Sequence, residues 1–173
     1  MATTGTHSEL ANFLAHSLEL ESEALERYAE LADSMDAHHN RPVAEFFRRM
    51  AGEAEHHLQE VAGLAGPMTL PALKAWEFDW PDAEPPETAS YEALHYRMSL
   101  RQAMTLALAN EHAAERYYRE FAKRSADAGT AAVATRFADE EQGHAAQLER
   151  MIAALPANGL HLLEEDDEPH ILE

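Results

Sequence analysis

Two stretches, ESEALERYAELA at residues 21–32 and EHAAERYYREFA at residues 111–122, share the pattern E-x-x-A-x-x-x-Y-x-x-x-A. Steps of three and four residues place the four matching positions on one face of an α-helix. A second pair recurs in the same order, because EAEH at residues 53–56 and EQGH at residues 141–144 both read E-x-x-H. The chain therefore looks like a duplicated helical hairpin, with one glutamate motif and one E-x-x-H motif in each half.

Helical periodicity extends outward from these motifs into four long segments, and almost no segment shows the alternation typical of strands. We expect helices at about residues 6–36, 41–64, 99–126 and 131–155. Ser, Thr and Asn residues stand at their starts, two of them with capping-box spacing, so they are the expected N-caps. These caps are Thr6, Asn40, Ser99 and Thr130.

The connections between the segments indicate how they pack. Short turns join the first helix to the second and the third to the fourth, so each of these pairs should be antiparallel. About thirty residues, rich in proline and acidic groups, separate the second helix from the third. Because each helix is roughly 40 Å long, this segment can run the length of the bundle. We therefore predict an all-α, antiparallel four-helix bundle at residues 1–155, with one long crossover at about 65–97, pinned by Trp76 and Trp80, and an acidic tail at 156–173.

Composition limits the functions open to the chain. It has 173 residues, enough for one domain with a full core, and 32 acidic residues against 13 basic ones give a net charge of −19. Such a surface repels phosphate backbones and anionic lipid, so we expect neither nucleic acid nor a membrane as partner. There is no cysteine, which excludes disulfides, thiolate zinc sites and iron–sulfur clusters within this sequence. Neither a secretory signal nor a membrane span is visible, so cytoplasmic localisation is the expectation.

Certain glutamates fall on the apolar stripes of the expected helices. The first stripe steps through residues 14, 18, 21, 25, 28, 32 and 35, and position 21 is a glutamate. The third stripe includes Glu111, and the fourth includes both Glu141 and His144. A buried carboxylate costs several kcal/mol unless something compensates its charge. We therefore expect these carboxylates to share one source of compensating positive charge.

Divalent metal is the obvious compensating charge, because carboxylates bridge cations and an imidazole can ligate one. The expected ligands come from all four helices and converge on one buried point, with the two histidines at opposite ends of the cluster. They are Glu21, Glu53, His56, Glu111, Glu141 and His144. Four glutamates carry four negative charges, which two ferrous ions would neutralise. We predict two iron ions as the cofactor, with manganese or zinc as substitutes.

The second helix leaves its ligand open between two neighbouring histidines. Its apolar stripe points as naturally to Ala54 and His57 as to Glu53 and His56. The E-x-x-H match and the repeat favour His56, and His57 is the alternative.

The whole pattern resembles the ferritin-like superfamily, and within it the rubrerythrin-type and bacterioferritin-type proteins. The resemblance covers residues from about 8 to 155 and is closest at ESEALERY (residues 21–28) and YREFA (residues 118–122). It implies iron in a four-glutamate, two-histidine set, reaction with dioxygen or hydrogen peroxide, and a homodimer or larger homo-oligomer. Two features depart from rubrerythrins: the cysteine-rich rubredoxin domain is missing from this sequence, and Ala114 stands where they carry a second helix-three glutamate. Glu115, one residue further on, is expected to be a rim carboxylate.

Three functions follow from this interpretation. The first is a di-iron oxidoreductase, an oxidase or peroxidase that takes electrons from an external donor protein. In that case Tyr28 and Tyr118, two helical turns beyond Glu21 and Glu111, could hydrogen-bond the groups around the site or supply an electron, although core packing explains them equally well. The second is a ferroxidase that handles or stores iron. The third is a structural bundle with a vestigial metal site.

Overall fold

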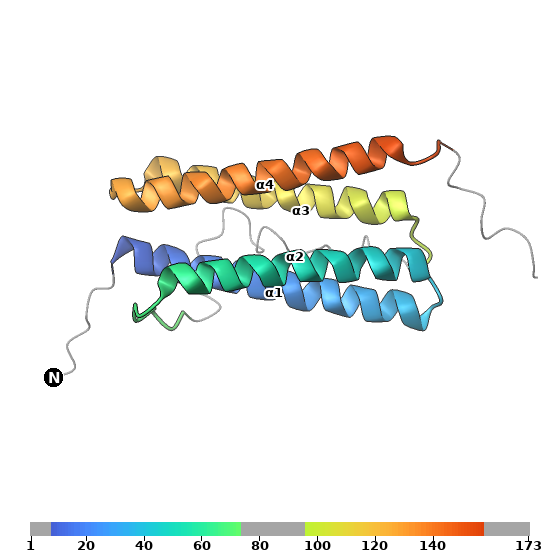
Figure 1. The fold of residues 1–173 in the computed structure, drawn as a ribbon, viewed down its shortest axis with the longest axis horizontal. Helices are drawn as coiled ribbons and strands as arrows, with labels where there is room; N and C mark the ends of the chain where they lie inside the picture. The colour runs from blue at the N-terminus through green and yellow to red at the C-terminus, as the bar shows by residue number, and fades with distance from the viewer. Residues whose placement is uncertain (1–7, 74–95, 158–173) are drawn as a thin grey trace, which may run out of the picture.

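Four α-helices and no strands make up the described part of the chain (Figure 1). In this computed structural model, residues 8–73 and 96–157 are described. The helices are α1 (Glu9–Ala37), α2 (Arg41–Ala65), α3 (Leu100–Arg124) and α4 (Ala128–Ala154). The all-α bundle predicted from periodicity is therefore confirmed, with every helix boundary within about two or three residues of its expected position.

The helices pack as two antiparallel hairpins, α1 with α2 and α3 with α4, stacked on each other (Figure 1). The start of α3 lies at the same end of the bundle as the turn between α1 and α2, so α2 and α3 run in the same direction (Figure 1). The end of α2 and the start of α3 therefore lie at opposite ends of the bundle. This is the arrangement expected of a bundle with one crossover connection.

Asn40 ties the two hairpins together at that end. It is the N-cap residue of α2, as predicted, but its side chain makes no cap hydrogen bond. Its Nδ2 instead donates to the carbonyl oxygens of Met98 at 2.9 Å and of Tyr96 at 3.1 Å. These bonds satisfy carbonyl groups just before α3 and fix the start of that helix against the α1–α2 turn.

The other helix starts follow local capping chemistry. Ser99 and Gln102 form the predicted capping box of α3, satisfying two backbone N–H groups reciprocally. Two expected caps differ from the structure. Ser8 caps α1, since its Oγ accepts from Ala11 N at 3.1 Å. Asp127 caps α4 in place of Thr130, whose N–H and hydroxyl both donate to Asp127 Oδ2. An ionised carboxylate accepts both donors in charge-assisted hydrogen bonds, which are stronger than the same bonds to a neutral hydroxyl.

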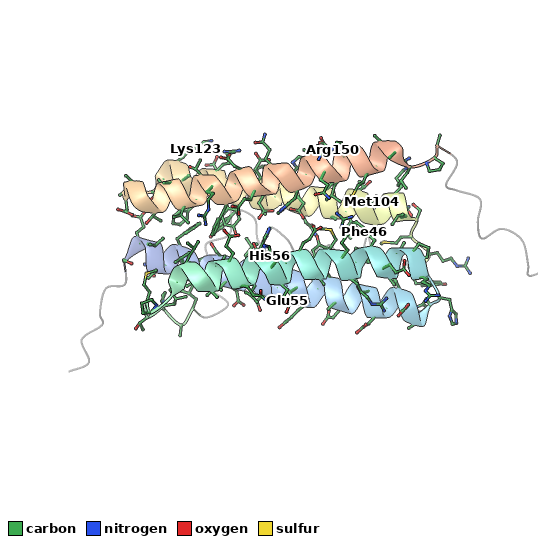
Figure 2. The ribbon with its side chains drawn as sticks, viewed as in Figure 1. Phe46, Glu55, His56, Met104, Lys123 and Arg150 are labelled. Carbon is green, nitrogen blue, oxygen red and sulfur yellow. The ribbon has the colours of Figure 1, made fainter. Side chains whose placement is uncertain are left out.

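Two apolar clusters fill the bundle, one toward each end. The first contains Tyr28, Phe46, Phe47 and Met104, and the second contains Phe13, Tyr118 and Phe137 among others. Phe46 and Met104 lie in the space between the two hairpins (Figure 2). On every helix the residues of one cluster give way to those of the other near the middle, which leaves a central layer between two dry cores.

Some expectations lie outside the described residues. They are Trp76 and Trp80 as anchors of the crossover, and most of the acidic tail, whereas the cap expected at Thr6 is replaced by Ser8. Of the helices that the structure describes, none combines the length and apolar character needed to cross a bilayer.

Candidate metal centre

Three glutamates occupy the central layer between the apolar clusters. Glu21 of α1 is 3% exposed, Glu111 of α3 is 8% exposed and Glu141 of α4 is 2% exposed. Each lies on the face that its helix buries, at the place in the apolar stripe that the sequence predicted. The three carboxylates come from three helices and both hairpins, so the tertiary fold is needed to gather them.

Two imidazoles complete the layer. Nδ1 of His57, on α2, lies 3.5 Å from Oε1 of Glu21 and 3.8 Å from Oε1 of Glu141. Nδ1 of His144, on α4, lies 3.3 Å from Oε2 of Glu141 and 3.4 Å from Oε2 of Glu111. The two rings stack with centroids 4.7 Å apart and planes 22° from parallel. The expectation that the two histidines lie at opposite ends of the cluster therefore differs from the structure.

His57, the alternative, supplies the imidazole from α2, and His56 does not. His56 is exposed and its ring centroid lies 6.4 Å from that of His57. The reason is the register of α2, whose buried residues Met50, Ala54 and Val61 share a face with position 57. Within α2 the apolar stripe decides which histidine points inward. The E-x-x-H pattern is therefore met by Glu141 and His144 but not by the inward groups of α2.

Glu53 lies at the edge of the layer. It lines the central cavity, yet 36% of its side chain is exposed and its Oε1 accepts from Nε of Arg49 at 3.1 Å. Of the six residues expected to bind metal, the structure thus gathers Glu21, Glu111, Glu141 and His144, holds Glu53 at the rim and turns His56 outward.

The buried groups perturb each other strongly. Burial raises the pKa of Glu21 and of Glu141, the latter to about 8, against the opposing effect of the neighbouring histidines. Burial alone would lower the pKa of His57, but its hydrogen bond with Glu21 and the charges of Glu21 and Glu141 raise it to about 9. Hydrogen bonds with Glu111 and Glu141 raise the pKa of His144 to about 10. Carboxylates crowded in an apolar bundle thus attract positive charge, whether protons or metal.

The donor set fits a transition-metal site. One ligand atom each from His57, Glu141 and His144 lie within 4.8 Å of one another. Imidazole nitrogen and carboxylate oxygen together suit iron, manganese and zinc. Glu21 and Glu111 each lie beside one of these histidines, and Glu53 borders the same cavity, so carboxylates are at hand for a second ion.

Tyr28 borders the site and Tyr118 packs elsewhere. The ring of Tyr28 lines the central cavity, and its hydroxyl accepts a hydrogen bond from Nδ2 of Asn110 at 3.1 Å. Tyr118 lies in the second apolar cluster, with ring centroids 5.4 Å from Phe137 and 5.9 Å from Phe13. The buried amide of Asn110 was not foreseen from the sequence. Its position beside Glu111 in the chain was the only available signal.

Glu115 forms surface ion pairs and does not belong to the central layer. Its Oε1 lies 3.2 Å from Nε of Arg119, which also pairs with Asp139 of α4 at 2.9 Å. Glu115 therefore belongs to a surface ion-pair network that links α3 to α4.

Comparisons with known proteins agree with this fold. The crystal structure of an uncharacterized conserved protein from Magnetospirillum magnetotacticum MS-1 is similar, with a TM-score of 0.66 and 37% sequence identity. The match covers 86% of this chain and 97% of that one. No protein of curated function matches the chain. The family model described as Rubrerythrin matches residues 12–104 and 102–165, which together span all four helices. The chain therefore belongs to the rubrerythrin family.

Proposed function

We propose that this protein is a non-haem di-iron oxidoreductase whose iron reacts with dioxygen or hydrogen peroxide. The observation that supports this most directly is the central layer of Glu21, Glu111, Glu141, His57 and His144, contributed by all four helices and held between two apolar clusters. The rubrerythrin family typically binds iron, and the donor set suits iron. Bound iron would supply one-electron redox chemistry and a Lewis acid at this place.

Each residue of the layer has a definite task. His57 and His144 would each supply a nitrogen ligand. Glu141, whose carboxylate oxygens lie 3.8 Å from Nδ1 of His57 and 3.3 Å from Nδ1 of His144, would supply a carboxylate between them. Glu21 and Glu111 can each complete the ligation beside one histidine. The apolar clusters on both sides exclude water, which strengthens the interaction of these charges with a cation.

The central cavity is too small to hold an organic substrate. Its volume is about 10 Å³, roughly the least that admits one water molecule. A hydroxylase would need a larger pocket beside the metal for its organic substrate. Tyr28 lines the cavity and is hydrogen-bonded to Asn110, so it is placed to stabilise a reactive group or donate an electron. Tyr118 packs within the aromatic cluster and does not line the cavity, so it is less well placed for the same role.

Electrons would come from a separate donor protein, since the sequence contains no cysteine to hold a thiolate-ligated redox centre. We also propose that the chain acts as a homodimer or larger homo-oligomer in the cytoplasm. Iron storage is the alternative function, and it would require a closed shell of many copies. Sedimentation of the purified protein separates the two, because a catalyst needs only a dimer.

A single-ion site is the alternative arrangement, favoured by the compact group of His57, Glu141 and His144. Metal analysis of protein purified without chelator, followed by anaerobic titration with ferrous ion, tests both arrangements. Two ions per chain, with consumption of dioxygen or peroxide on exposure, would support the proposal. One ion per chain would favour the three-residue site, and no bound metal would leave the vestigial structural bundle.

A further inference from the structure

Glu53 lies between the central cavity and the protein surface, unlike the buried carboxylates of the layer. On one side it borders the central cavity with Glu21 and Glu141. On the other side its Oε1 accepts a hydrogen bond from Nε of Arg49, whose side chain is 47% exposed. The side chains of Glu21 and Glu141 are only 3% exposed, against 36% for Glu53. Glu53 is therefore the most accessible carboxylate bordering the cavity among the described residues.

The ion pair between Arg49 and Glu53 is a weak restraint. It joins residues four apart on one helix turn, and exposed pairs of this type contribute little to stability. A divalent cation near the cavity attracts the same carboxylate with twice the charge and in a less polar setting. The carboxylate thus has two competing partners, the surface arginine and any cation in the cavity that it lines.

We propose that Glu53 is a two-position ligand and that Arg49 is the positioning residue that holds it in the outer position. In the outer position the carboxylate stands at the solvent edge of the cavity and meets incoming ions there. In the inner position it joins the second ion. Arg49 competes with metal for the carboxylate, so it weakens retention of that ion and speeds its exchange. This inference rests on the proposed function, because it assumes that a second ion binds beside Glu21.

Arg49→Gln tests the competition, and Arg48→Gln is its matched control. The two arginines are adjacent on α2 and equally exposed at 47%, but Arg48 pairs with Asp36 of α1 and not with Glu53. The probe is cobalt(II), whose visible absorption reports its coordination, added to the full chain and then withdrawn with a chelator. Thermal melts of each variant without metal verify that all of them are folded.

In Arg49→Gln, the more weakly bound of the two cobalt ions should bind about two- to threefold more tightly and dissociate correspondingly more slowly than in the wild type. Arg48→Gln should match the wild type. The factor is what an exposed ion pair four residues apart supplies. In a Glu53→Gln background the weak ion should be lost, and adding Arg49→Gln should change nothing further. Equal behaviour of Arg49→Gln and Arg48→Gln in a wild type that binds two ions would overturn this inference alone. A wild type that binds no cobalt and no iron would overturn the proposed function with it.

Discussion

Loading the central site with two divalent ions at pH 7 should release about three protons per chain. Histidine ligates metal in its neutral form and glutamate in its ionised form, so any proton on these groups must leave. The pKa values are about 9 for His57, about 10 for His144 and about 8 for Glu141. All three groups are therefore about nine-tenths or more protonated at pH 7 in the metal-free protein. Glu21, whose pKa burial also raises, can only add to the count.

The same protons make metal affinity depend steeply on pH. With about three protons released, the combined affinity for two ions should fall roughly a thousandfold between pH 7 and pH 6. Isothermal titration calorimetry in buffers of different ionisation enthalpy counts the protons directly. The heat of binding should change with the buffer in proportion to the number released.

Two variants assign the protons to residues. His57→Ala should lower the count by about one, because it deletes one of the protonated groups. His56→Ala should leave the count unchanged, because that side chain is exposed and lies away from the carboxylates. Release of fewer than one proton by the wild type would refute the reasoning. It would mean that the buried carboxylates and histidines are not charged as their mutual distances indicate.

Three further predictions follow from the same geometry. Without metal, the free energy of unfolding should fall in pH-dependent melts from about pH 6.5 toward 10, because the raised pKa values of His57 and His144 stabilise the folded state while they are protonated. Glu111→Ala should stay folded but lose the rise in melting temperature, about 5–10 °C, that ferrous ion at a hundredfold excess over its Kd gives the wild type. Asn40→Ala should cost about 1–2 kcal/mol in denaturant melts through two lost hydrogen bonds to the segment before α3.

Much of the fold could be predicted from periodicity because each helix buries one stripe. Along α1, α3 and α4 the buried glutamates Glu21, Glu111 and Glu141 stand where an apolar residue would continue the stripe. A local pattern is sufficient there, since the direction of a side chain follows from its place in the helix. The hydrogen bond from Asn40 to Met98 could not be predicted from the sequence. It joins residues 58 apart, and their approach depends on how the two hairpins stack.

The site in α2 shows which of two sequence signals carries physical weight. The match of EAEH to EQGH favoured His56, whereas the apolar stripe of the sequence fitted either histidine. In the structure the buried residues Met50, Ala54 and Val61 place His57 on the inward face. Burying that stripe removes several apolar side chains from water, and each contributes on the order of 1–3 kcal/mol. A short sequence motif contributes no comparable free energy to the rotation of a helix about its axis. The apolar stripe therefore sets the register, and it places Glu53, one residue before the buried Ala54, at the rim.

The position of Glu53 at the rim changes how the centre is understood. Three buried glutamates and two histidines are costly to enclose, and replacing buried charged groups by apolar residues of similar volume is often neutral or stabilising. Their presence in all four helices is therefore better explained by binding than by stability. A fourth glutamate at the solvent edge adds nothing to the core, yet it borders the same cavity. A closed cage would take up and exchange ions slowly, so one accessible carboxylate held by a weak surface pair gives the centre a route to solvent that its buried ligands lack.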